Sequence, residues 1–432
     1  MVMRLTHLSA AALLLLGVRT EAQTWDQPGL QGLGTVHDIA LYNGDLYITG
    51  DFEEIGGVTV DHIARWDGSA WSPVGTGLTS DGYGTALAVY NGELYVSGYF
   101  DTAGGVNAYR IARWNGSTWS NVLTGLDMML VANDMLVIGN LLYIGGSPDP
   151  TCNTPLVNMV QWNGSAFSTV GTGELQYLAS SLLLGTVHAL AEDQGELCVA
   201  GVFDHVDGLA CEGLLLWDGS TWSAGPSGLP TSYNLDVAFI NGSLTCAQNS
   251  DLVMQWNGTT WTDFTIGLPG SGVTMAMVEL NGIPVIGGAY NAGPFAKNPA
   301  WAEVGSLTGA PSVQQLRVLN GELYAVGDQG VVVNGNVERH TLVARLASPL
   351  GLPDRERTSL RPYPNPATDR LYLDRPVHTT DAIRILDLQG RVVEGWSMQG
   401  PDRVDVRALP TGMYQLEVRQ EGGLSVGRFV KE

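Results

Sequence analysis

Basic side chains are scarce in this 432-residue chain, which has 21 Lys and Arg against 43 Asp and Glu and a formal net charge of −22. The imbalance is regional, because residues 23–350 hold 30 acidic and 7 basic side chains, whereas residues 351–432 hold 12 of each. An acidic surface repels phosphate backbones and anionic lipid headgroups. The composition therefore argues against nucleic acid and anionic membranes as partners and is compatible with cations or neutral glycans.

Long apolar runs are also missing. The one near the start, Leu8–Val18, has about 11 residues, which is too short to span a bilayer as a helix, and no second run follows it. Arg4 precedes this run and Thr20-Glu21-Ala22 follows it, as is typical of a signal peptide. We therefore expect a signal peptide over residues 1–22 and an exported mature chain without a transmembrane segment.

Cysteine is rare, with 4 residues, and none has the spacing of a zinc site. Cys198 and Cys246 fall within strand patterns and are expected as small core residues. Cys152 and Cys211 fall in equivalent long loops of neighbouring sequence repeats. Because an exported chain permits disulfides, a bridge between these two is predicted.

Glycine is abundant, with 56 residues, and much of it marks tight turns. Residues 24–347 contain about seven copies of one pattern, roughly 48 residues apart; the clearest are Val36–Leu78 and Thr85–Leu126. Each full copy carries an Asn-Gly pair, such as Asn43-Gly44, and an Asp-Gly or Asn-Gly pair between aromatic residues, such as Trp66–Trp71. Both are hairpin signals, so each copy predicts four strands.

The first turn also predicts a register. With Asn43-Gly44 as a two-residue loop, Tyr42 pairs with Asp45 and Ala40 lies opposite Tyr47. The same treatment of the second turn pairs Trp66 with Ser69, so that Trp71 becomes a diagonal neighbour of Trp66. Both faces of these strands are largely apolar, which is typical of blades packed between other blades.

A four-stranded unit repeated seven times predicts an all-β fold, a seven-bladed β-propeller over residues 23–349. Blade six lacks the second turn but keeps Trp301, and blade three carries an insertion at Glu174–Thr186. The seventh copy ends at Leu346 without its outer Trp-bearing strand. Since Trp25 begins such a strand, we expect the N-terminal segment to complete blade seven and close the ring.

These repeats resemble kelch-like and galactose-oxidase-type propeller repeats of secreted bacterial proteins. The resemblance implies the fold and leaves the activity open.

The remainder of the chain consists of a linker, residues 350–360, and a segment, residues 361–432, whose alternating apolar residues and turns predict a small Ig-like β-sandwich. Four motifs occur there in order: a Tyr-Pro-Asn-Pro opening, an Asp-Leu-x-Gly-Arg turn, a Leu-x-x-Gly-x-Tyr turn and a terminal basic residue. Their residues are Tyr363, Pro364, Asn365, Pro366, Gly390, Gly412, Tyr414 and Lys431.

Together these motifs resemble the type A C-terminal sorting domain of the type IX secretion system of Bacteroidetes. The resemblance implies contact with the secretion machinery and passage through the periplasm and across the outer membrane. The protein would then be secreted or attached to the cell surface.

The first strand of each predicted blade is expected to line the central channel. Its early positions form a partly polar ring. Two interpretations of this ring are open: it binds a ligand or metal ion, or its side chains simply line the channel and are solvated. The candidate binding residues are His37, Asp38, Asp134, His188, Asp236 and Gln315.

Loop carboxylates leave calcium binding open, although no dense Asp-rich calcium motif is present; otherwise no cofactor is expected. These carboxylates are Glu53, Asp101, Asp204 and Asp207.

No nucleophile elbow, phosphate loop or paired-carboxylate motif occurs. We therefore favour a binding or adhesion module for extracellular glycans or proteins. An extracellular carbohydrate-active enzyme, a lyase or hydrolase with its site on one propeller face, is the alternative, and the catalytic residues it would use are unknown.

Overall fold

The computed structural model divides the chain into two compact units, Met1–Leu350 and Gly351–Glu432. The predicted signal peptide lies outside the described residues. Within the described part, every regular element is a β-strand, and no helix is long and apolar enough to cross a membrane. The described residues are 25–27, 32–79, 81–122, 130–148, 157–171, 175–178, 183–290, 293–298, 300–304, 307, 311–333, 336–346, 358–359, 362–363, 366–373, 382–386, 393, 395–400, 402–420 and 423–431.

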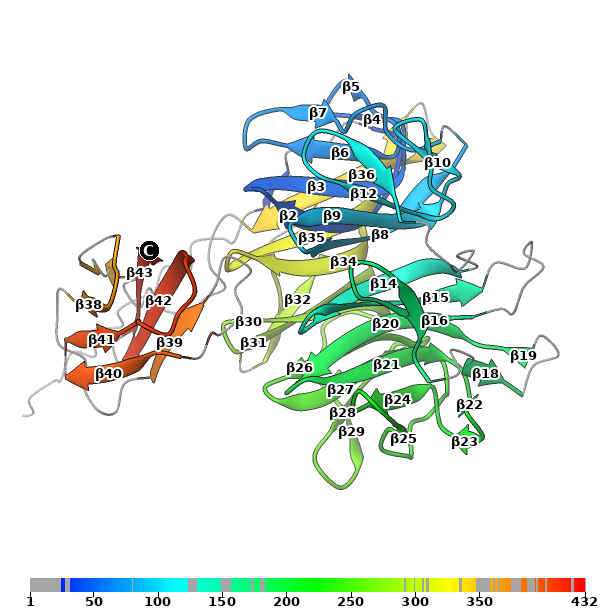
Figure 1. The fold of residues 1–432 in the computed structure, drawn as a ribbon. Helices are drawn as coiled ribbons and strands as arrows, with labels where there is room; N and C mark the ends of the chain where they lie inside the picture. The colour runs from blue at the N-terminus through cyan, green and yellow to red at the C-terminus, as the bar shows by residue number, and fades with distance from the viewer. Residues whose placement is uncertain are drawn as a thin grey trace, which may run out of the picture. The chain divides into compact units, whose positions relative to one another are not determined.

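The first unit contains seven four-stranded antiparallel blades (Figure 1). Blades one to four consist of β2 (Gly34–Tyr42), β3 (Asp45–Phe52), β6 (Ile63–Trp66) and β7 (Trp71–Pro73); β8 (Tyr83–Tyr90), β9 (Glu93–Tyr99), β12 (Ile111–Trp114) and β13 (Trp119–Asn121); β14 (Leu130–Ile138), β15 (Leu141–Pro148), β16 (Met159–Trp162) and β17 (Phe167–Thr169); and β20 (Thr186–Asp193), β21 (Glu196–Val202), β24 (Leu214–Trp217) and β25 (Trp222–Ala224). Blades five to seven consist of β26 (Asn234–Ile240), β27 (Ser243–Gln248), β28 (Val253–Trp256) and β29 (Trp261–Asp263); β30 (Gly272–Leu280), β31 (Ile283–Tyr290), β32 (Phe295–Lys297) and β33 (Trp301–Glu303); and β34 (Pro311–Leu319), β35 (Glu322–Val333), β36 (Asn336–Leu346) and β1 (Trp25–Asp26).

The first strands of the blades form a closed ring. They contact one another in the order β2, β8, β14, β20, β26, β30 and β34, and β34 contacts β2 again. The colours of Figure 1 follow this order from the blue first blade to the yellow seventh. The seven-bladed propeller predicted from the repeat is therefore confirmed.

The hydrophobic core lies between blades. A separate cluster of buried apolar side chains fills each of the seven junctions, as at the blade one–two junction, where Tyr47 and Trp114 pack together. Each blade therefore buries both faces, as its sequence predicted. Cys198 and Cys246 are buried free thiols in the cluster between blades four and five.

The register of the first hairpin is confirmed. Tyr42 pairs with Asp45 and Ala40 with Tyr47, and Asn43 and Gly44 have φ angles of 52° and 90°. These positive angles are those a two-residue type I′ turn needs.

The predicted register of the second hairpin is wrong, because Trp66 pairs directly with Trp71. The loop has four residues, Asp67–Ala70, and only Gly68 has a positive φ, 96°. One Asp67 carboxylate oxygen accepts the backbone N–H groups of Ser69, at 2.8 Å, and Ala70, at 2.9 Å. This side-chain turn lengthens the loop and brings the two tryptophan rings to 5.2 Å, a direct cross-strand pair.

The two faces of the propeller differ in their connections. One face, the turn face, carries the tight hairpin turns of each blade. The other, the loop face, carries the connections between second and third strands and between successive blades. Extra short strands lie there: β4 (Glu54–Ile55) with β5 (Val58–Thr59), β10 (Thr102–Ala103) with β11 (Val106–Asn107), and a four-stranded sheet of β18 (Leu175–Tyr177), β19 (Leu183–Leu184), β22 (His205–Val206) and β23 (Leu209–Ala210).

Closure by the N-terminal strand is confirmed. Trp25 pairs with Leu346 and Asp26 with Arg345. The indole N–H of Trp25 donates to the carbonyl of Val304, 279 residues away, at 2.5 Å. The outer strand of blade seven thus comes from the other end of the sequence, and this removes a free sheet edge.

The second unit is a small β-sandwich with its own core. One sheet contains β37 (Thr358–Ser359), β43 (Gly423–Lys431), β42 (Gly412–Gln420) and β39 (Ala382–Leu386), and the other contains β38 (Arg370–Tyr372), β41 (Arg403–Asp405) and β40 (Ser397–Gly400). Tyr414 stacks on Phe429 with ring centroids 5.5 Å apart, and its hydroxyl donates to the carbonyl of Pro410 at 2.8 Å. Both rings are buried, so this contact joins β42 and β43.

Candidate functional site

The channel is lined by seven equivalent β-bulges, one in the first strand of each blade. In blade one, the bulge lies between Val36 and Asp38, and His37 is the extra residue. A bulge interrupts the ladder of hydrogen bonds, so nearby backbone N–H groups need other acceptors. The residue after the bulge supplies them in alternate blades: it is Asp in blades one, three and five and Ala in blades two, four and six.

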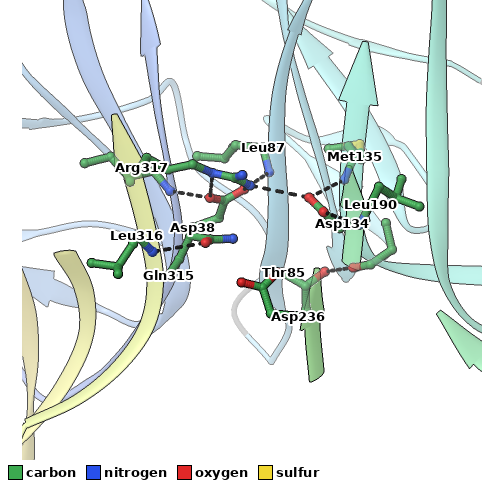
Figure 2. A network of polar contacts seen from close by, with 12 residues as sticks. Asp38, Thr85, Leu87, Asp134, Met135, Leu190, Asp236, Gln315, Leu316 and Arg317 are labelled. Atoms are coloured by element: carbon green, nitrogen blue, oxygen red, sulfur yellow. Dashed lines mark hydrogen bonds and ion pairs between the residues drawn. The ribbon is translucent and has the colours of Figure 1, made fainter. Parts of the chain in front are cut away.

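Each of these three carboxylates joins its own blade to the next one, and Figure 2 shows the contacts of Asp38 and Asp134. Asp38 accepts the N–H of Ile39 and that of Leu87 in blade two, both at 2.8 Å. Asp134 bonds in the same way to Met135 and Leu190, at 2.9 Å each, and Asp236 to Val237 at 2.8 Å and Met277 at 2.6 Å. The alanine of the even-numbered blade leaves room for the incoming carboxylate. The predicted acids therefore fasten pairs of blades together.

The acid and alanine positions pair blades one with two, three with four and five with six. Because the number of blades is odd, blade seven has no partner in this pattern. Gln315 stands at the acid position and accepts the N–H of Leu316 at 3.0 Å. From the same strand, Arg317 reaches Asp38, with Nε to Oδ1 at 3.3 Å, and Asp134, with Nη2 to Oδ1 at 3.4 Å (Figure 2). One guanidinium thus balances two of the three carboxylates.

The two predicted histidines also join blades. The Nδ1–H of His37 donates to the carbonyl of Gly84 at 2.9 Å, and that of His188 donates to the carbonyl of Asn234 at 2.8 Å. Thr85 and Asn133 make the same contact from blades two and three, at 2.5 and 2.7 Å. Burial lowers the pKa of His188 and so favours its neutral form.

Of the predicted ring residues, Asp38, Asp134, Asp236 and Gln315 lie in one region of the propeller (Figure 2), and Asp134 interacts electrostatically with both Asp38 and Asp236. Burial raises the pKa of Asp236 to about 7, and the charge of Asp134 adds to this shift. Although Asp236 is partly exposed as a residue, its carboxyl lies deep among protein atoms. Among the described residues, no group of three or more His, Cys, Asp or Glu side chains could hold a metal ion. The ligand role predicted for this ring stays a prediction.

Arg317→Met tests the charge balance of this ring. We expect it to lower the free energy of unfolding at pH 8 by about 3 kcal/mol, because two buried carboxylates lose their counter-charge. Burial already raises the pKa of Asp134 and Asp236. The stability contributed by these carboxyls is present below the usual Asp pKa of about 3.9 and is lost as the pH rises through their raised pKa values, about 7 for Asp236.

The penalty of Arg317→Met should therefore be smaller at pH 5 than at pH 8 in urea unfolding. Arg65→Met is the matched control, because Arg65 pairs with Asp45 at 2.6 Å on an exposed surface, where such a pair contributes roughly 0–1 kcal/mol. An equal loss at both pH values for Arg317→Met would contradict the role of charge.

The loop face carries the exposed large apolar side chains of the propeller's described residues: Leu33, Tyr99, Tyr109, Leu178, Tyr233 and Ile266. On blade two, the rings of Tyr83 and Tyr99 are 5.1 Å apart and that of His37 is 5.3 Å from Tyr83. Arg110 covers the ring of Tyr99 at 6.0 Å and pairs with Asp101 at 3.2 Å. We call Tyr83, Tyr99, Tyr109 and Arg110 the tyrosine platform.

The backbone under the platform is strained. Tyr109 and Arg110 have φ angles of 42° and 76°, which cost non-glycine residues of order 1–3 kcal/mol each. The fold needs this conformation, since the Arg110 carbonyl accepts the N–H of Gly98 at 3.0 Å and the hydroxyl of Ser97 at 2.7 Å. Blade four places Gly213 at the equivalent position, with a φ of 70°. The fold therefore explains the backbone angle but not the choice of a large side chain.

Neither Arg317 nor the platform was among the predicted site residues. Arg317 had a signal: it is one of only 7 basic residues in residues 23–350 and stands where blades one and two carry Ala40 and Ala88. Tyr99 and Tyr109 had none, because tyrosines recur in the repeat sequence and only the fold shows which of them are exposed.

Other predicted sites are partly visible. In the sorting motifs, Gly412 pairs with Lys431, which also bridges to Ala367, next to Pro366. Tyr363 is exposed and stacks on Tyr372 at 5.7 Å. Pro364, Asn365, Gly390 and Cys152 lie outside the described residues. Cys211 is a free thiol, which does not support the predicted bridge to Cys152, a residue outside the described ones.

Residues 361–432 match the family described as the secretion system C-terminal sorting domain. Among solved structures, the extracellular domain of the putative one-component system BT4673 from B. thetaiotaomicron matches with a TM-score of 0.52 at 9% identity, over 94% of this chain and 53% of that one. The chain thus spans about half the length of that domain.

Two further structures match at lower scores. PorZ, a bacterial surface component of the type IX secretion system of Porphyromonas gingivalis, has a TM-score of 0.39 at 13% identity, over 90% of this chain and 64% of that one. The computationally designed Ika8 protein has a TM-score of 0.41 at 13% identity, over 72% and 98%. No curated protein matches the chain significantly in sequence.

The second unit is therefore a type IX secretion sorting domain. Such a domain directs its cargo across the outer membrane, so the propeller is secreted or attached to the cell surface and interacts with the secretion machinery on its way. The similarity at 9% identity shows the fold alone.

Proposed function

We propose that the propeller is an extracellular binding module that recognises a neutral glycan chain through the tyrosine platform. A signal peptide over residues 1–22 would deliver the chain to the periplasm, and the sorting domain carries it onward. The kelch-like character of the repeats belongs to the same proposal. The observation that carries it is the concentration of exposed tyrosines on one face.

The platform has the chemistry of a saccharide site. Tyrosine offers a flat apolar ring with a hydroxyl at its edge and loses little conformational entropy on binding. Tyr99 and Tyr109 are 42% and 51% exposed, respectively. Exposed acids surround them on the same face, including Asp51, Asp81 and Asp101. These acids accept hydrogen bonds from hydroxyl groups and repel polyanions.

The acids of the channel ring serve a structural role, which makes them poor candidates for catalysis and leaves the loop face as the better candidate for recognition. Both oxygens of each ring carboxylate accept backbone N–H groups from two blades, so the acids are already held in structural bonds. The loop face, by contrast, presents side chains whose rings reach solvent. Loops held by a rigid scaffold are common positions for recognition.

The double variant Tyr99→Ala/Tyr109→Ala is expected to weaken glycan binding at least tenfold while leaving the melting temperature within about 2 °C, because both rings are exposed. Calorimetry against a panel of neutral and acidic polysaccharides measures the affinity, and product analysis of the same mixtures detects cleavage. Ile266→Ala is the control, since it removes an exposed apolar side chain from the same face outside the platform. Unchanged affinity in the double variant would contradict the proposal, and retention of proteins alone would replace the glycan with a protein partner.

A further inference from the structure

A groove of about 550 Å³ opens on the turn face, at the junction between blades seven and one. We call it the closure groove. Its volume falls within the range of small-molecule sites, roughly 300–1,000 Å³. It lies on the face opposite the tyrosine platform, and its lining includes Leu41, Leu46, Trp66, Leu319, Glu322 and Arg345.

The groove lies at a junction that lacks the tyrosine of blades one and two. Blades three, five and six also carry an aliphatic residue at this position: Ile138, Ile240 and Leu280. At the end of β2, the hydroxyl of Tyr42 crosses to the carbonyl of Gly92 in blade two at 3.1 Å. At the end of β8, Tyr90 crosses to the carbonyl of Asn140 in blade three at 2.7 Å. At the end of β34, the same position is Leu319, which has neither ring nor hydroxyl and is only partly buried. The space that a tyrosine fills at those two junctions is left open here.

Trp66, the tryptophan at this junction, is also partly exposed. Between blades two and three, the indole N–H of Trp162 donates to the hydroxyl of Tyr95 at 3.2 Å, and Trp162 is buried. The counterpart of Tyr95 in blade seven is Tyr324, whose hydroxyl donates to Glu322 at 3.0 Å instead. Trp66 of blade one is therefore only partly buried and lines the groove.

The polar wall of the groove is a chain of paired charges. Arg345 contacts Asp26 at 2.8 Å and Glu322 at 3.7 Å, and Asp67 also lines the groove. Three acids against one arginine disfavour an anionic ligand. Each carboxylate keeps further lone pairs for hydroxyl donors, and the guanidinium has five N–H donors for hydroxyl oxygens.

We propose that the closure groove binds a neutral saccharide, with a sugar ring against Trp66 and its hydroxyls on Glu322 and Arg345. A ligand rich in hydroxyl groups matches a wall of acceptors and donors beside an apolar floor formed by Leu41 and Leu319. A peptide strand fits less well, because Gly44, Gly68 and Asn320 place hairpin turns around the groove, and turns present no free strand edge.

A ligand in this groove contacts both sides of the ring closure. Asp26 belongs to the closing strand, Leu319 and Arg345 to the rest of blade seven, and Trp66 to blade one. Binding to the closed ring alone stabilises it by mass action. Saccharide binding should therefore raise the melting temperature of the propeller.

Leu319→Tyr tests the proposal without disturbing the fold, because it places at blade seven the residue that blades one and two already use. Isothermal titration of the full chain with cellotriose, maltotriose and mannotriose is expected to show binding of at least one of them. The Leu319→Tyr variant should lose at least tenfold in affinity and lose the ligand-dependent rise in melting temperature. Leu319→Met keeps the volume of the side chain and leaves the groove open, so its affinity should stay within twofold.

The loop face is kept separate in this experiment. Tyr99→Ala/Tyr109→Ala should retain binding at the closure groove, and Leu319→Tyr should retain binding at the tyrosine platform. A saccharide that uses both sites should therefore show a stoichiometry that falls by one in each variant.

The proposal is overturned if none of the three trisaccharides binds, if Leu319→Tyr binds them as well as the natural chain does, or if trigalacturonate binds this groove more tightly than they do.

Discussion

Trp25→Ala is expected to lower the free energy of unfolding of the propeller by about 3–5 kcal/mol, the usual cost of truncating a buried tryptophan. The ring is 8% exposed and belongs to the apolar cluster between blades six and seven. Its indole N–H reaches the carbonyl of Val304, and its backbone pairs with Leu346. The substitution therefore removes both packing and a hydrogen bond at the place where the two ends of the propeller sequence meet. Urea unfolding measures the loss.

Trp119→Ala is the matched control. Trp119 is 7% exposed, and its indole N–H donates to the carbonyl of Val74 in the preceding blade at 3.0 Å, so it occupies the equivalent position in blade two. We expect a similar loss of global stability there. Only Trp25→Ala should speed hydrogen exchange at those amides near Arg345 and Leu346 that point towards β1, because only β1 covers that edge of β36. Equal exchange at these amides in both variants would show that the N-terminal strand does not close the ring.

The repeat allowed the architecture to be predicted because its turn residues have few alternatives. Asn43-Gly44 adopts two positive φ angles, and Asn-Gly is the pair that does so at the lowest cost. The predicted register of the second turn is wrong because the Asp67 side chain caps Ser69 and Ala70 and so stabilises a four-residue loop. A dipeptide signal does not show which loop length a capping side chain will select.

The channel shows a different limit. The position of the ring follows from the repeat, since residues just after each blade start must face the axis. Its chemistry depends on the pairing of blades: Asp38 needs the N–H of Leu87, which lies 49 residues away. An acid in one blade and an alanine in the next form a matched pair. This match is recognised only when the two strands are placed side by side. The same holds for Leu319, whose meaning depends on the space that Tyr42 and Tyr90 fill elsewhere.

A chain that ends at residue 360 is expected to leave a folded propeller in the periplasm, with none at the cell surface. The sorting domain carries the export signal, since residues 361–432 match that family. The propeller contains its own seven apolar clusters and should fold without this domain. Fractionation of cells locates the protein, and an unchanged melting temperature of the truncated protein shows that the propeller is intact.

Two point variants of the full chain separate the fold of the sorting domain from its surface. Phe429→Ala removes a ring that is 1% exposed and stacks on Tyr414, and a loss of about 3–5 kcal/mol is expected to unfold so small a sandwich. Export should then fail as it does in the truncation. Tyr363→Ala removes a ring that is 55% exposed, so the domain should stay folded, and any loss of export must come from a contact that Tyr363 makes with the secretion machinery. If the chain ending at residue 360 reached the surface in normal amounts, the export signal would have to lie in the propeller or upstream of it.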